Sequence, residues 1–93
     1  MLEKQIEKSS VQKAKAEGWY TRKFASPSHR GVPDRLFIKN GVVVFIELKT
    51  KVGKVSKLQE EELQDLRDHG VIAVVCRSVE EVMATLHAAE EHT

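Results

Sequence analysis

The stretch GVPDRLFIKNGVVVFIELKT, residues 31–50, decides the fold of this chain. Two runs within it, Arg35–Lys39 and Val42–Leu48, are β-branched, aliphatic or aromatic at most positions. The dipeptide Asn40-Gly41 joins them, and both of its residues tolerate the positive φ that a type I′ turn requires. We therefore predict an antiparallel hairpin with a two-residue turn.

The turn length also fixes which residues of the two strands face each other. With a two-residue turn Lys39 pairs with Val42, and counting outward brings Asp34 opposite Glu47. Residues directly opposite each other have Cβ atoms about 4.5–5.5 Å apart. Lys49 lies two residues beyond Glu47, so its side chain emerges on the same face. Unless a bulge shifts this register, two carboxylates and an ammonium group meet at one end of the hairpin.

Two acids at this position need a partner. Like charges across a ladder are destabilising, and burying them costs several kcal/mol, on the order given for unpaired ions. Leu36 and Ile38 share a face with Asp34, which indicates that this face is covered. Carboxylates with no nearby Cys or His are hard oxygen ligands, so a divalent cation would be Mg²⁺ or Mn²⁺. In the alternative interpretation Asp34 is a turn residue, and Glu47 and Lys49 form a solvated edge.

The segments on either side of the hairpin predict three helices and two further strands. Residues 2–17 have apolar residues at helical spacing, 19–24 alternate aromatic and polar residues, and 25–32 are rich in turn formers. Ser56-Lys57-Leu58-Gln59 has the form of a capping box and opens a helix that ends at Gly70, with Leu58, Leu63 and Leu66 on its inner side. Residues 71–76 predict a strand buried on both faces, and a second capping box at 78–81 opens the last helix. The order is α-β-β-β-α-β-α, an α/β fold with a small mixed sheet flanked by helices.

Size and composition predict a single domain over residues 1–93, with an ordered core at about 2–87 and a frayed tail. Hydrophobic residues make up 41% and charged residues 31%, which is typical of a globular domain. No apolar run approaches the roughly 18 residues that cross a bilayer, so no membrane partner is expected. The start, MLEKQIEKSS, has no signal-peptide core, which predicts an intracellular, cytoplasmic protein.

The residues around the predicted acids resemble a known family. Pro33-Asp34 followed by Glu47-Leu48-Lys49 is similar to the PD-(D/E)xK nuclease signature. Within that superfamily the chain resembles the virus-type replication-repair nuclease (VRR-NUC) domain, on residues 30–35, Gly41, residues 46–49, and Ser56 with Gln59. The resemblance covers residues 3–86 and implies a restriction-endonuclease-like core.

The resemblance also implies roles for individual residues. Asp34 and Glu47 would be metal ligands together with the backbone carbonyl of Leu48, and Lys49 would be the catalytic lysine. Gln59 would lie beside the site and position the lysine, water or phosphate, although the capping box alone accounts for a glutamine there.

The family's first helix supplies a further acid, which maps onto Glu3, with Glu7 one turn along the same helix face.

Basic residues follow and flank the predicted site. Lys51, Lys54 and Lys57 lie in one segment after the catalytic strand, with Arg30 and Arg22 on the other side. Such clusters are more often a solvated surface, but beside a metal-carboxylate site they are placed to contact DNA phosphates without reading sequence. For Trp19 and Tyr20, core packing is favoured over stacking on a splayed base.

The resemblance predicts a Mg²⁺- or Mn²⁺-dependent DNA endonuclease. Stand-alone members of the family resemble Holliday junction resolvases acting as homodimers, so branched DNA and a two-fold pair of sites are expected, in a phage or prophage setting. The alternatives are a monomeric nicking or flap-type nuclease and a catalytically silent DNA-binding module.

Overall fold

Four strands form a single sheet in the order β1-β2-β3-β4, and three helices cover it. A computed structural model of the chain describes residues 1–92. The elements follow the predicted order: α1 (Glu3–Ala16), β1 (Tyr20–Lys23), β2 (Arg35–Lys39), β3 (Val42–Leu48), α2 (Lys57–Asp68), β4 (Ile72–Cys76) and α3 (Val79–Glu91).

The Asn40-Gly41 turn has the predicted backbone conformation, with φ of 50° at Asn40 and 82° at Gly41. The β2–β3 ladder accordingly runs from Lys39 opposite Val42 to Arg35 opposite Ile46, in the predicted register and without a bulge. β1 pairs antiparallel with β2, and β3 pairs parallel with β4. The mixed sheet is therefore confirmed, and α2 is the crossover between its two parallel strands.

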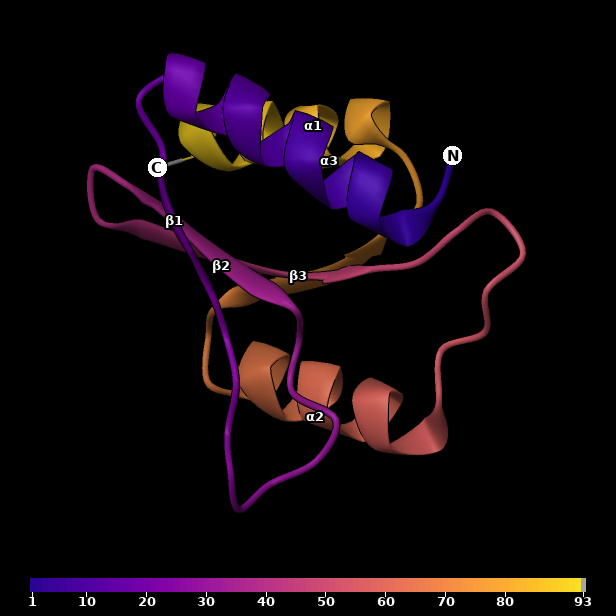
Figure 1. Cartoon of the computed structure of the whole chain (residues 1–93). Helices are drawn as coiled ribbons and strands as arrows, with labels where there is room; N and C mark the ends of the chain where they lie inside the picture. Colours follow the sequence, from indigo (N-terminus) through magenta and orange to yellow (C-terminus); the bar gives the residue numbers. More distant parts are fainter. Residues whose placement is uncertain (93) are drawn as a thin grey trace.

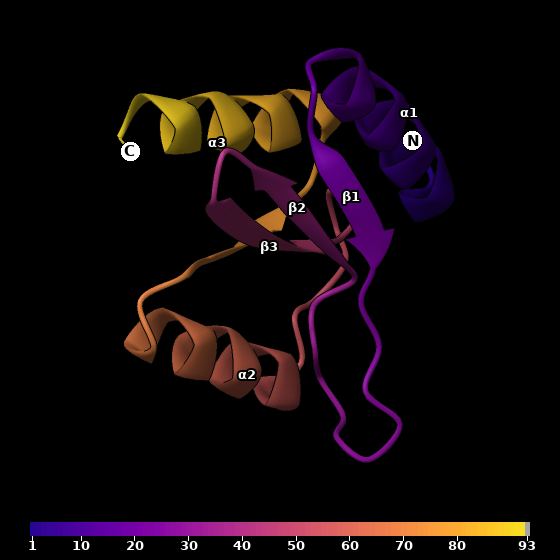
Figure 2. The same cartoon turned by 90° about the vertical axis from the view of Figure 1, so that its left-hand side faces the viewer.

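The helices lie in two layers, one on each face of the sheet. Figures 1 and 2 show α1 and α3 together over one face and α2 alone beneath the other. The 25–33 loop descends from β1 on the α2 side and returns to β2 (Figure 2). The end of the hairpin that carries the predicted acids therefore lies between two covered faces.

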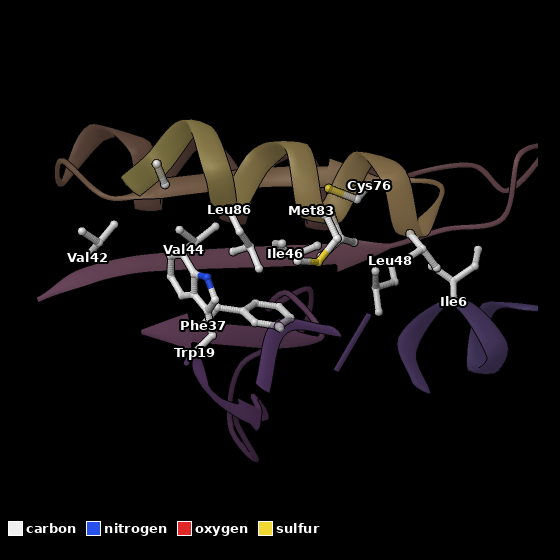
Figure 3. Close-up of a cluster of buried hydrophobic side chains, with 14 residues drawn as sticks. Ile6, Trp19, Phe37, Val42, Val44, Ile46, Leu48, Cys76, Met83 and Leu86 are labelled. Carbon is white, nitrogen blue, oxygen red and sulfur yellow. The ribbon is translucent and has the colours of Figure 1, made fainter. Parts of the chain in front are cut away.

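Most of the core lies between the sheet and the α1–α3 layer. Figure 3 shows Val44, Ile46 and Leu48 of β3 facing Met83 and Leu86 of α3, and all five side chains are buried. Burying these apolar surfaces supplies about 25 cal/mol for each Å² removed from water.

The two aromatic residues at the start of β1, Trp19 and Tyr20, differ in their burial. Trp19 is 3% exposed and belongs to the core, as predicted. Tyr20 is 51% exposed, so the same prediction was wrong for this residue. The alternation of side chains along a strand explains the difference, because successive residues point to opposite faces.

Two predictions, about Leu58 and β4, need correction. Leu58 is 52% exposed, because it lies five positions before the buried Leu63 and is therefore about 140° away around the helix. β4 is an edge strand, and its Ile72 is 36% exposed, so β4 is not buried on both faces.

The last helix continues to Glu91, past residue 87, because Ala89 extends the buried stripe of Val82 and Leu86 at helical spacing. Residues 88–92 are therefore not a frayed tail in the structure, and Thr93 lies outside the described residues. Within residues 1–92, no helix is both long enough and apolar enough to cross a bilayer.

Gly31 should be the glycine least tolerant of a side chain. It has φ of +86°, and a Cβ atom there would lie 2.8 Å from the carbonyl oxygen of Leu58 in α2. Gly70 is a matched control, because its φ is +88° but no heavy atom lies within 4 Å of the added Cβ. We expect Gly70→Ala to lower the free energy of unfolding by about 1 kcal/mol and Gly31→Ala by about 2–4 kcal/mol. Urea denaturation measures both values, and equal losses would contradict the close packing of the loop on α2.

Candidate active site

Asp34 begins the site from just outside the ladder. The last β2–β3 pair is Arg35 with Ile46. The register count predicted that Asp34 is the ladder partner of Glu47, and this prediction was wrong. The chain leaves the ladder here, and the Asp34 carbonyl accepts a hydrogen bond from the Phe24 amide at 2.9 Å. Its carboxylate nevertheless reaches across to the end of β3.

The contact that holds the Asp34 carboxylate is a charge-assisted hydrogen bond. Its Oδ2 atom accepts the backbone N–H of Leu48 at 2.7 Å. Because Leu48 lies between Glu47 and Lys49, this bond fixes Asp34 beside both of the other predicted site residues. The structure therefore brings Asp34, Glu47 and Lys49 together.

Glu47 is the buried centre of the site. The residue is 2% exposed, and its Oε2 atom accepts a hydrogen bond from Gln59 Nε2 at 3.0 Å. The same oxygen lies 3.3 Å from Lys49 Nζ. The second oxygen, Oε1, is buried and has no hydrogen-bond partner among the described residues. Buried polar atoms in native proteins are nearly always satisfied, so this oxygen indicates a missing partner.

The surroundings of Glu47 change its acidity. Burial raises the pKa of its carboxyl group to about 7, and the negative charge of Asp34 adds to the increase. The hydrogen bond and charge of Lys49 act in the opposite direction, and Glu3 at the start of α1 raises the pKa a little further. The group is therefore poised between its two protonation states near neutral pH, which is typical of functional sites.

Gln59 closes the capping box and also contacts Glu47 of the predicted site. Its Oε1 atom accepts the Ser56 N–H at 3.0 Å, and the Ser56 hydroxyl oxygen accepts the Gln59 N–H at 3.1 Å. The Nε2 group is left to donate to Glu47. An amide has one acceptor oxygen and one donor nitrogen, so the helix cap and the site use its two ends at the same time.

The two candidate acids of α1, Glu3 and Glu7, differ in their contacts. Glu7 Oε2 accepts a hydrogen bond from Arg35 Nε at 2.7 Å, so this side chain ties α1 to β2. Glu3 makes no ion pair or side-chain hydrogen bond with residues 1–92, is exposed, and lies close enough for its charge to act on Glu47.

The predicted DNA-contacting residues are all accessible. Arg30, Lys51, Lys54 and Lys57 are exposed. Arg22 is also exposed and places its guanidinium 4.3 Å from the centre of the Tyr20 ring.

Arg77 holds the loop that follows the site, and it was not predicted from the sequence. Its Nη1 atom donates to the carbonyl oxygens of Thr50 at 2.8 Å and Gly53 at 2.6 Å. These bonds hold the loop that follows Lys49 and carries Lys51. No local pattern could have revealed them, because Arg77 lies 24 or more residues away in the chain.

The donor set fits a hard divalent cation. No group of three or more Asp, Glu, His or Cys side chains that could hold a metal occurs within residues 1–92. Mg²⁺, however, commonly takes one or two protein carboxylates and fills its other positions with water and phosphate. Asp34 and the unpartnered Oε1 of Glu47 provide that minimum.

A mixed sheet with an acid before one strand and an acid-x-lysine at the end of the next defines a PD-(D/E)xK nuclease domain. A model of the VRR-NUC domain family matches residues 4–80. The chain therefore belongs to the VRR-NUC domain family, and it is a nuclease domain.

Relatives and solved structures agree with this assignment. A solved structure described as a VRR-NUC domain matches with a TM-score of 0.83 and 26% identity, over 91% of this chain and 94% of that one. A second, described as a VRR-NUC domain protein, has a TM-score of 0.85 over 98% of this chain and 89% of that one; at 15% identity it shows the fold alone. The protein "Putative nuclease p44" of Acyrthosiphon pisum secondary endosymbiont phage 1 is 41% identical over 61 residues. That match covers 64% of this chain and 66% of the phage protein, just under two thirds of its length.

The raised pKa of Glu47 predicts how the stability of the metal-free protein depends on pH. Below the ordinary pKa of 4.5 the carboxyl group is protonated in both the folded and the unfolded chain. As the pH rises from 4.5 to about 7, the unfolded chain releases this proton and the folded chain retains it, so stability falls. A pKa difference of this size corresponds to about 3 kcal/mol.

Glu47→Gln should therefore remove most of this fall between pH 4.5 and 7. Urea unfolding in the presence of EDTA measures it for both proteins. The exposed Glu61→Gln is the matched control and should behave as wild type. A parallel fall in wild type and Glu47→Gln would contradict the assignment of the pH dependence to Glu47.

Proposed function

We propose that this nuclease domain is a Mg²⁺- or Mn²⁺-dependent endonuclease that hydrolyses phosphodiester bonds in DNA. The observation that carries the proposal is the buried, unpartnered Oε1 of Glu47 beside a second carboxylate and a lysine. A cation there would satisfy this oxygen and offset the repulsion between the two acids.

Each side chain of the site then has a distinct task. Asp34 and Glu47 would hold the cation, with the Leu48 carbonyl and Glu3 as further ligands. A bound Mg²⁺ or Mn²⁺ would lower the pKa of a water molecule and stabilise negative charge on the phosphate.

Lys49 and Gln59 act on either side of Glu47. In the absence of a cation, Lys49 neutralises the charge of Glu47, with Nζ 3.3 Å from Oε2. With a cation at the site, Lys49 would instead donate a hydrogen bond to the attacking water or the phosphate. Gln59 is a positioning residue, because its amide fixes Glu47 while its other end is anchored in the α2 cap.

DNA would approach over the loop that follows β3. Lys51, Lys54 and Lys57 neutralise backbone phosphates on this side, and Arg30 and Arg22 do so on the other. Arg77 keeps the loop in place through its bonds to Thr50 and Gly53. Such contacts position DNA without reading its sequence, so selectivity for shape is expected.

Variants of the site test the proposal through its separate steps. With Mn²⁺ present, Asp34→Asn and Glu47→Gln should each reduce DNA cleavage by about a hundredfold or more, because both replace a charged carboxylate ligand with a neutral amide. Lys49→Ala should abolish cleavage but retain Mn²⁺ binding by calorimetry, and Gln59→Ala should cost about 10–100-fold. Glu61→Gln and Lys15→Ala alter exposed residues elsewhere and serve as controls. Full-rate cleavage by Asp34→Asn or Glu47→Gln would contradict the proposed site.

We further propose that the domain acts on branched DNA as a homodimer, in an intracellular, phage- or prophage-encoded setting. The support is that residues 1–92 contain one candidate site, since symmetric cleavage of a four-way junction needs two sites related by a two-fold axis. The phage origin of p44 supports the setting.

Sedimentation and a substrate panel test the branched-DNA proposal. We expect a dimer at micromolar concentration, and faster cleavage of a four-way junction than of a flap, a splayed arm or a linear duplex. A monomer that prefers flaps would exclude junction resolution and favour the nicking or flap-type alternative.

A further inference from the structure

A second basic surface lies beside the site, in a groove between α1 and the β1 edge of the sheet. The groove has a volume of about 270 Å³, and Val11 is among the residues that line it. The groove is lined by one acid, Glu7, and by four basic residues: Lys4, Lys8, Lys23 and Arg35. Lys4, Lys8 and Arg35 are not among the residues that the sequence marked for phosphate contacts, and Lys23 adjoins one of them, Arg22.

The charge of this groove is not balanced within the protein. Glu7 is already paired with Arg35 at 2.7 Å, so these two charges cancel. Lys4, Lys8 and Lys23 are exposed and make no ion pair or side-chain hydrogen bond with any residue from 1 to 92. Three unpaired positive charges around one hollow raise the local potential and favour an anionic ligand.

One end of the groove lies near the candidate site, on the other face of the sheet. Arg35 directly follows Asp34, but its bond to Glu7 places its side chain on the α1 face. The carboxyl group of Glu47 is bonded on the opposite face, to the first turn of α2. Lys4 directly follows Glu3, whose charge acts on Glu47. A strand of nucleic acid with one phosphate at the site would therefore reach the groove around this end of the sheet.

We propose that the α1–β1 groove binds backbone phosphates of the DNA strand on the Asp34 side of the cleaved bond. This inference rests on the proposed nuclease function and adds a binding surface to it. Lysine binds phosphate as a mobile point charge, so the groove strengthens binding without selecting a sequence. Lys51, Lys54 and Lys57 follow β3 and come from different elements, so DNA would be held from two sides of the cleavage point.

Binding in EDTA tests the groove without cleavage. Lys8→Gln removes one charge from the groove, and Lys13→Gln removes one from the same helix outside it. Each lost phosphate contact on duplex DNA lowers the slope of log K against log salt by about 0.9. We expect Lys8→Gln to lower the slope by about one, the Lys4→Gln/Lys8→Gln/Lys23→Gln variant by about two to three, and Lys13→Gln to leave it unchanged. Equal changes for Lys8→Gln and Lys13→Gln, or no change for either, would overturn the proposal.

A small substrate separates this inference from the proposed function. Bis(p-nitrophenyl) phosphate reaches the site but is too short to enter the groove. With Mn²⁺ the triple variant should hydrolyse it at the wild-type rate, yet show a raised KM for long duplex DNA. An equal loss on both substrates would assign the lysines to folding or chemistry and overturn the groove, and thermal melting checks the fold. If wild type cleaves neither substrate, the nuclease proposal fails, while the salt slopes still decide whether the groove binds DNA.

Discussion

The buried carboxyl group of Glu47 is the constraint on which the rest of the site depends. One of its oxygens is held by Gln59 and Lys49, and the other has no partner within the described residues. An unsatisfied buried carboxylate is destabilising, so a fold that keeps one must gain something from it. In the proposed function that gain is cation binding, because a divalent cation would partner the free oxygen and offset the Asp34 charge that helps to raise the pKa of Glu47.

The fold supplies this constraint through elements that are distant in sequence. β3 brings Glu47 to the end of the sheet, and its Leu48 amide holds Asp34. α2 returns the chain so that its first turn both caps the helix and presents Gln59 to Glu47. The capping box at the start of α2 is therefore linked to Glu47 through the side chain of Gln59.

Local patterns made the hairpin predictable, because the Asn-Gly turn and the alternation of apolar residues together leave one register. The same count failed at Asp34, since the chain leaves the ladder after Arg35 and only the side chain reaches β3. Arg77 and the α1–β1 groove could not be predicted, because both depend on how separate elements pack. For Gln59 the sequence left open whether the residue closes the capping box or lies beside the site, and the geometry of its amide shows that it caps α2 and contacts Glu47 at the same time.

A crystal grown with Mn²⁺ and measured at the manganese absorption edge would show whether the two carboxylates share a cation. We expect an anomalous peak about 2.1 Å from one oxygen of Asp34 and from Oε1 of Glu47. Diffraction that showed no manganese between these two carboxylates, with Glu47 bound only to Gln59 and Lys49, would contradict the proposed cation site.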